Sequence, residues 1–184
     1  MTLLLVMEAI DSGKISLDDQ VTASAHAASM GGSDIWLKEG ETMSVNDLIK
    51  ATVIMSANDA AVVLAEHVYG TEDEFVKQMN IRAKQLGMND TTFKNCNGLD
   101  EDGHLTTAHD VALMSAELIK HEKIFDYTLT WMDYVRDGET QLVNTNKLIR
   151  SYKGITGLKT GTTSQAGSCI SATAKRDKLS LVAV

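Results

Sequence analysis

The first ten residues, Met1–Ile10, read MTLLLVMEAI and contain only two polar side chains, Thr2 and Glu8. A helix of this composition is apolar on nearly every side, so it is stable only where other elements cover it all round. Asp11-Ser12-Gly13 follows, and glycine is frequent just past the end of a helix. The sequence therefore predicts a helix at the centre of a domain, around which the rest of the chain must pack.

Apolar periodicity and capping residues predict four further helices in the middle of the chain. Ser44, Thr71 and Thr107 are the expected N-caps, because each is a Ser or Thr with an acidic residue three positions later. The triplet Ser56-Ala57-Asn58 interrupts the first helical stretch, and loops are expected on either side of these helices. The expected helices cover residues 45–55, 59–69, 72–87 and 108–121, and the expected loops cover 31–40 and 95–104.

The last third of the chain has the character of strands. Asp137-Gly138 is a typical hairpin turn, and helices followed by an antiparallel meander predict a mixed α/β (α+β) domain, with an antiparallel sheet and a helical cluster. No linker or repeat divides the chain, so residues 1–184 are expected to form a single domain. The expected strands are Thr91–Lys94, 130–135, 141–143, Gly157–Thr162, Ser168–Lys175 and Lys178–Val184.

Composition and charge argue against several classes of protein. The chain has 17 Lys and Arg against 25 Asp and Glu, a formal net charge of -8, and no basic run, so no nucleic-acid partner is expected. The longest uninterrupted apolar run, Leu3–Met7, is far too short to cross a membrane, and no signal peptide is visible. Neither Cys96 and Cys169 nor the five histidines have metal-ligand spacing, so neither a metal nor a cofactor is expected.

Two triplets contain the residue types that acyl-transfer chemistry uses. Ser56-Ala57-Asn58 lies at a break between helices, and Lys159-Thr160-Gly161, followed by Thr162, lies on an expected strand. Taken separately, the first is usually a helix cap and the second is usually the end of a strand. In this order, however, they match the second and third motifs of the serine penicillin-binding proteins and β-lactamases, whose first motif is Ser-x-x-Lys.

Longer segments narrow the resemblance to the low-molecular-mass penicillin-binding proteins, which are the serine-type D-alanyl-D-alanine carboxypeptidases of peptidase family S11. Essentially the whole chain resembles this family, with every segment in the family's order. The resemblance implies the serine β-lactamase or DD-peptidase-like transpeptidase fold. The segments that carry it are GSDIWLKEGE (32–41), SANDAA (56–61), NGL (97–99), TAHD (107–110), NTNKL (144–148) and GLKTGTT (157–163).

The resemblance also implies how the strand would recognise a substrate. Lys159 would bind the terminal carboxylate of a peptidoglycan stem peptide that ends in D-Ala-D-Ala, and β-lactams would occupy the same place. Thr160 and Gly161 would border the bound peptide, which can lie against the strand because Gly161 has no Cβ. The backbone N–H of Thr162 would be one donor to the oxyanion.

The other triplet would take part in proton transfer and orientation. By the same resemblance, Ser56 would relay a proton to the leaving D-Ala. Asn58 would hold the substrate amide and help to orient the catalytic lysine of the first motif.

That first motif, Ser-x-x-Lys, is absent from the 184 residues. In the family it stands at the start of the central apolar helix, immediately before the segment that corresponds to Met1-Thr2-Leu3-Leu4. The missing motif and the missing N-cap predict truncation before Met1, and a last strand without a turn signal predicts the loss of a strand and helix after Val184. We expect the chain as written to be inactive and to form no covalent penicillin adduct, since acyl transfer needs a nucleophile.

Two other functions stay open at this point. The first is a catalytically silent module that binds peptidoglycan. The second, a class A β-lactamase, ranks lower because no convincing Glu-x-x-x-Asn loop lies between His104 and Asn144. For the full-length protein the resemblance implies an extracytoplasmic location, at the outer face of the cytoplasmic membrane. An open sheet edge would favour self-association of the chain.

Overall fold

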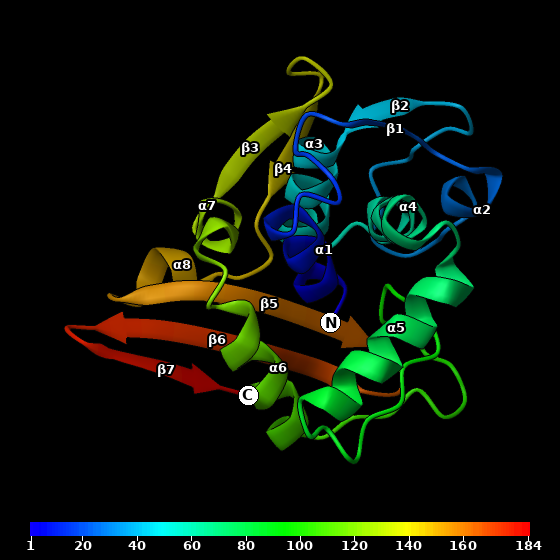
Figure 1. Cartoon of the computed structure of the whole chain (residues 1–184). Helices are drawn as coiled ribbons and strands as arrows, with labels where there is room; N and C mark the ends of the chain where they lie inside the picture. Colours follow the sequence, from blue (N-terminus) through cyan, green and yellow to red (C-terminus); the bar gives the residue numbers. More distant parts are fainter.

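Helix α1 (Thr2–Asp11) lies at the centre of the computed structural model, which describes residues Met1–Val184. Its side chains are largely buried, as a helix that is apolar on nearly all sides requires. Helices α4 (Asn58–Tyr69) and α6 (Ala108–Leu118) pack against it, and its N-terminal end points towards a three-stranded sheet (Figure 1). The predicted central helix is therefore confirmed.

The three predicted N-caps are confirmed as well. In each, the hydroxyl oxygen accepts a hydrogen bond from the backbone N–H three residues later, which satisfies one of the free donors in the first turn. The bonds run from Asp47 N to Ser44 Oγ (3.1 Å), from Glu74 N to Thr71 Oγ1 (3.2 Å) and from Asp110 N to Thr107 Oγ1 (3.1 Å).

The stretch 45–55 is not one uniform helix, in contrast to the prediction. Helix α3 (Val45–Lys50) continues as a π-helical turn, η1 (Ala51–Met55), which ends at Ser56. Apolar periodicity does not distinguish an α-turn from a π-turn, so this change could not be predicted. The short helices were not predicted either, because three or four residues carry no periodic pattern. These short helices are α2 (Ala25–Ala28), η2 (Glu122–Ile124), α7 (Phe125–Thr128) and α8 (Leu148–Ser151). The remaining helix, α5 (Glu72–Gln85), lies within the predicted range 72–87.

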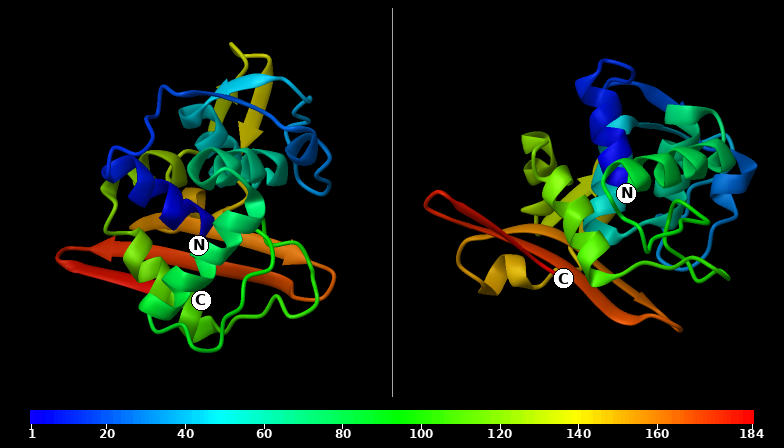
Figure 2. Two further views of the ribbon diagram at one scale, coloured as in Figure 1. Left: turned by 45° about the vertical axis from the view of Figure 1, so that its right-hand side comes forward. Right: turned by 60° about the horizontal axis from the view of Figure 1, so that its bottom comes forward.

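The strands form three separate antiparallel sheets, which confirms the expected mixed α+β fold with a helical cluster. In the largest sheet the order is β5-β6-β7, so β5 and β7 are both edge strands. Helix α6 packs against this sheet (Figure 2). There Ser115 Oγ and Ser171 Oγ form a buried hydrogen bond of 2.7 Å. The strands are β1 (Gln20–Thr22), β2 (Thr42–Ser44), β3 (Met132–Val135), β4 (Thr140–Val143), β5 (Ile155–Thr163), β6 (Gly167–Arg176) and β7 (Leu179–Ala183).

The predicted strand at Thr91–Lys94 is wrong. The segment makes only an isolated bridge, between Thr92 and Leu105. On its other side the Asn80 side chain takes the place of a neighbouring strand: Phe93 N donates to Asn80 Oδ1 (2.9 Å), and Asn80 Nδ2 donates to Phe93 O (2.8 Å). Here an amide side chain satisfies the N–H and C=O groups of the extended backbone, and the local sequence does not reveal this contact.

No helix of the chain combines the length and the apolarity needed to cross a membrane. The main apolar core joins α1, α3, α4 and the buried side of α5. The three-stranded sheet lies beside this core (Figure 1). Its edge strand β5 contacts the turn just before α4 through a hydrogen bond between Lys159 and Ser56.

Candidate active site

Ser56 occupies a strained position between the π-helical turn and α4. Its backbone is left-handed, with φ 62° and ψ 36°. This conformation costs a residue with a Cβ roughly 1–2 kcal/mol of free energy, and such positions cluster at functional sites. Ala57 N donates to Ala51 O (3.1 Å), and Asn58 then begins α4 with only 8% of its surface exposed. The predicted break at the triplet is thus a left-handed turn between η1 and α4.

Lys159 on β5 reaches this turn. Its Nζ donates to Ser56 Oγ at 2.7 Å and to Thr160 O at 2.8 Å. The two triplets are therefore in direct contact, although 103 residues separate Ser56 from Lys159. The structure brings together the two side chains that were predicted to share a site, while their roles in a reaction stay predictions.

The ammonium group of Lys159 is partly buried, and its hydrogen-bond partners are neutral groups. Burial lowers the pKa of Lys159 from 10.5 to about 8, and no charged neighbour contributes to the shift. An ammonium group has three N–H donors, and only two have partners here. A buried cation with a free donor favours an anionic ligand, since a carboxylate would satisfy the donor and offset the cost of burying the charge.

The residues after Lys159 form an open edge. Strand β5 pairs only with β6, so its other edge is unpaired. A Cβ placed on Gly161 would meet nothing within 4 Å, and Thr162 is exposed. Thr160 Oγ1 instead forms a 2.6 Å hydrogen bond with Thr145 Oγ1, from the loop after β4. An extended peptide can add to such an edge through backbone hydrogen bonds.

Sequence reasoning missed several residues that hold this site together. Asn58 Nδ2 donates to Gly31 O at 2.8 Å, a backbone acceptor in the expected loop 31–40. The exposed carboxylate of Asp100 contacts the turn after β5, where its Oδ2 accepts bonds from Ser164 Oγ (2.9 Å) and Gln165 N (3.2 Å). These bonds connect the loop at residues 95–104 to the turn after β5. Hydrogen bonds from the side chains of Thr163 and Ser164 hold the pKa of Asp100 below its usual value. Both contacts join segments that are far apart in the sequence, so no local pattern predicts them.

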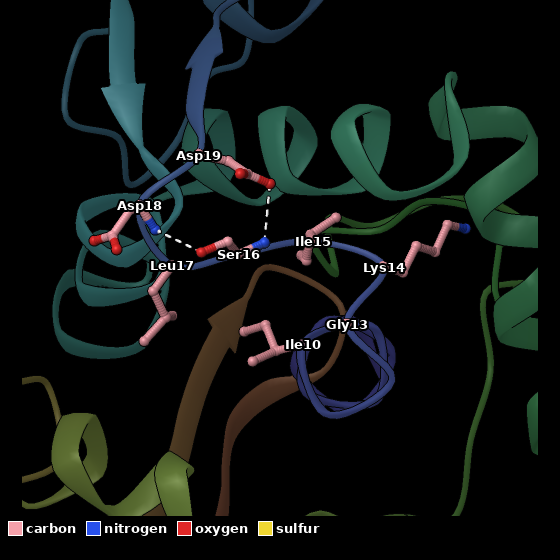
Figure 3. Close-up of a pocket in the computed structure, with 8 residues that line it drawn as sticks. All are labelled: Ile10, Gly13, Lys14, Ile15, Ser16, Leu17, Asp18 and Asp19. Carbon is pink, nitrogen blue, oxygen red and sulfur yellow. Dashed lines mark hydrogen bonds between the residues drawn. The ribbon is translucent and has the colours of Figure 1, made fainter.

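A hollow elsewhere on the surface contains none of these residues (Figure 3). It lies in the loop between α1 and β1, where Ser16 N donates to Asp19 Oδ2 (2.9 Å) and Asp18 N donates to Ser16 Oγ (3.3 Å). No cluster of three or more His, Cys, Asp or Glu side chains is arranged to hold a metal ion. The strongest candidate site of the chain is therefore the contact between Ser56 and Lys159.

The lowered pKa of Lys159 makes stability depend on pH in a defined window. Between about pH 8 and 10.5 the unfolded chain keeps this lysine protonated while the folded chain does not, so the free energy of unfolding rises with pH. We predict that the wild type gains on the order of 1–3 kcal/mol over Lys159→Met across this window, in urea denaturation at each pH. A difference that stays constant with pH would contradict the assignment.

Comparisons with known proteins identify the family of the chain. The chain matches the D-alanyl-D-alanine carboxypeptidase family, peptidase S11, over residues 1–184. It is 50% identical over 187 residues to the D-alanyl-D-alanine carboxypeptidase DacF of Bacillus subtilis, which covers 100% of this chain and 48% of that protein. Identity to the D-alanyl-D-alanine carboxypeptidase DacC of Escherichia coli is 37% over 191 residues, with 100% and 48% covered. The chain thus spans about half the length of the curated relatives it matches.

Solved structures share the fold. Penicillin-binding protein 6B from Escherichia coli has a TM-score of 0.88 at 34% identity, covering 99% of this chain and 60% of that one. Penicillin-binding protein D2 from Listeria monocytogenes, in its ampicillin-bound form, has a TM-score of 0.87 at 36% identity, covering 98% and 74%. The resemblance inferred from the sequence is confirmed: this chain belongs to the D-alanyl-D-alanine carboxypeptidase family, peptidase S11.

Proposed function

We propose that this protein is a serine-type D-Ala-D-Ala carboxypeptidase that removes the terminal D-Ala from peptidoglycan stem peptides and binds β-lactams. The 184 residues supply the part of the site that recognises the substrate. The observation that carries the proposal is the 2.7 Å contact between Lys159 Nζ and Ser56 Oγ, beside the open edge of β5. Such a protein would act at the outer face of the cytoplasmic membrane, where its substrate lies.

The geometry supports a specific binding mode. The terminal carboxylate of the peptide would meet the buried ammonium of Lys159, which has no anionic partner in the chain. The peptide backbone would extend along β5 past Gly161, where nothing obstructs it. The N–H of Thr162 would then face the carbonyl oxygen of the scissile bond, as a donor to the oxyanion.

Ser56 suits the transfer of a proton to the leaving group. Its Oγ accepts a hydrogen bond from Lys159 Nζ, so its own O–H is free to point towards the substrate. When a nucleophile adds to the carbonyl carbon and the C–N bond breaks, the nitrogen of the leaving D-Ala needs a proton. Ser56 would relay the proton that the nucleophile loses: its O–H gives one proton to the nitrogen, its oxygen takes up the other, and Lys159 stabilises that oxygen in between. Asn58 would hold the substrate amide alongside.

The carboxylate-binding role of Lys159 predicts a change in affinity. We expect Lys159→Met to weaken the binding of an N-acetylated peptide ending in D-Ala-D-Ala by about 10- to 100-fold, the usual range for a lost charge-assisted hydrogen bond. Near pH 8 the bound carboxylate should raise the pKa of Lys159, so binding should take up protons. Titration calorimetry in two buffers of different ionisation enthalpy measures both effects.

The control for this experiment is Lys153→Met, since Lys153 is an exposed lysine shortly before β5. It should leave the affinity and the proton uptake unchanged. Equal losses in the two variants would mean that the ligand responds to the overall charge of the surface rather than to the buried ammonium.

The absence of Ser-x-x-Lys predicts that these 184 residues form no covalent penicillin adduct. Intact-mass spectrometry after incubation with benzylpenicillin should show the unmodified mass. Cys169 is an exposed free thiol, so Cys169→Ser serves as the control for unspecific acylation. A stoichiometric adduct on both the wild type and this variant would show that another residue is the nucleophile.

The missing motif also favours a second candidate function, a catalytically silent module that binds peptidoglycan. Both functions predict peptide binding through Lys159. The two functions predict different results for a chimaera in which a Ser-x-x-Lys segment of the Bacillus subtilis relative is joined before Met1. A penicillin adduct in that chimaera supports the carboxypeptidase, whereas binding without an adduct supports the silent module.

We also propose that the 184-residue chain self-associates through β7. This strand pairs only with β6, and Leu179 and Leu181 on it are 58% and 52% exposed. An exposed apolar edge strand can pair with a second copy. Sedimentation velocity should show concentration-dependent dimers that Leu181→Lys reduces, because a lysine on an edge opposes pairing. A clean monomer at high concentration would rule this out.

A further inference from the structure

The segment from Gly31 to Leu37 lies against the first turn of α4, although it contains no helix or strand. The carboxylate of Asp59, which is only 1% exposed, holds it there. Asp59 Oδ2 accepts hydrogen bonds from Ile35 N (3.1 Å) and Leu37 N (3.0 Å), and Oδ1 accepts one from Ala60 N (2.8 Å). A buried carboxylate is costly unless it is well bonded, so these three backbone donors and Asp59 stabilise one another.

Trp36 lies between the two anchored amides in an unusual conformation. Its φ is +55°, in the left-handed region, and its side chain is 71% exposed. Because this large side chain is mostly exposed, burial of the ring does not account for the strained backbone. The bonds from Ile35 N and Leu37 N to Asp59, on either side of Trp36, hold it instead.

The anchored segment contacts the backbone and the side chain of Asn58. Asn58 N donates to Ser33 O at 2.7 Å, and Asn58 Nδ2 donates to Gly31 O at 2.8 Å. Gly32 lies so close that a Cβ added to it would be 2.8 Å from Asn58 Nδ2. The bond to Gly31 O decides which end of the Asn58 amide is the nitrogen, and it leaves Oδ1 and the second N–H of Nδ2 for other partners.

We propose that the segment 31–37, anchored by Asp59, is the element that orients the Asn58 amide for substrate. Asp59 and Gly32 are positioning residues: Asp59 holds the segment in place, and Gly32 leaves the space that the amide occupies. The proposal rests on the proposed function insofar as Asn58 binds the peptide. It predicts that affinity depends on residues that do not touch the ligand.

The chain offers a matched pair of variants for the test. Gly32 and Gly40 both have positive φ, +87° and +80°, so an alanine at either position is strained. A Cβ at Gly40 meets nothing within 4 Å, whereas one at Gly32 meets Asn58. Gly32→Ala and Gly40→Ala therefore share the backbone strain and differ in the contact with Asn58. Asp59→Asn is the second test variant, because it replaces one acceptor oxygen with a donor that faces backbone N–H groups.

The first measurement follows the side-chain NH₂ signals of Asn58 in ¹⁵N–¹H correlation spectra of the 184-residue chain, assigned by their loss in Asn58→Asp. We expect Gly32→Ala and Asp59→Asn to shift or broaden these signals, and Gly40→Ala to leave them in place. The second measurement is the affinity for the N-acetylated D-Ala-D-Ala peptide. Gly32→Ala should weaken binding by about tenfold, roughly the contribution of one or two hydrogen bonds, and Gly40→Ala by less than about twofold.

Equal behaviour of Gly32→Ala and Gly40→Ala in the spectra would overturn the proposal, and so would unchanged Asn58 signals in Asp59→Asn. If Gly32→Ala does not fold, Asp59→Asn compared with Gly40→Ala decides the matter by the same signals. The spectra require no ligand. If the Asn58 signals move as expected while no variant, including Lys159→Met, alters peptide affinity, the positioning role holds and the proposed function fails.

Discussion

The partly buried ammonium group of Lys159 is the feature on which the rest of the site depends. Its two partners, Ser56 Oγ and Thr160 O, are neutral, so the fold does not compensate the charge and the pKa falls to about 8. A bound carboxylate would supply the negative charge that is missing. A buried lysine would be a poor choice for stability alone, because an apolar side chain of similar size would fill the space without the cost of desolvation.

Much of the fold could be predicted because its signals are local. Ser44, Thr71 and Thr107 cap helices through bonds to residues only three positions away, and the apolar character of α1 is visible in ten consecutive letters. The predictions fail where a group that is distant in the sequence determines the local structure. The strand expected at Thr91–Lys94 is satisfied by the side chain of Asn80, which no local pattern reveals.

The residues of the candidate site likewise divide into those that could be predicted from the sequence and those that could not. Ser56, Asn58 and Lys159 could be found because their triplets occur in a fixed order, and the structure shows that two of them touch. The groups around them could not be found. Gly31 contributes only a carbonyl oxygen to Asn58, and the carboxylate of Asp100, which contacts the turn after β5, resembles any solvated acid in a loop. Every residue has a backbone oxygen, so a sequence pattern does not indicate which of these oxygens accepts a hydrogen bond from a distant side chain.

The backbone around Asn58 also shows how rigidity arises where regular structure is absent. Ser56 and Trp36 are both left-handed without being glycine, and neighbouring residues fix the backbone of each. At Ser56 the π-helical turn ends, and α4 begins two residues later. At Trp36 the carboxylate of Asp59 holds the flanking amides. Two strained turns therefore meet at Asn58 and Asp59, so the geometry that would recognise a peptide is built by contacts within these residues and does not require the nucleophile to be present.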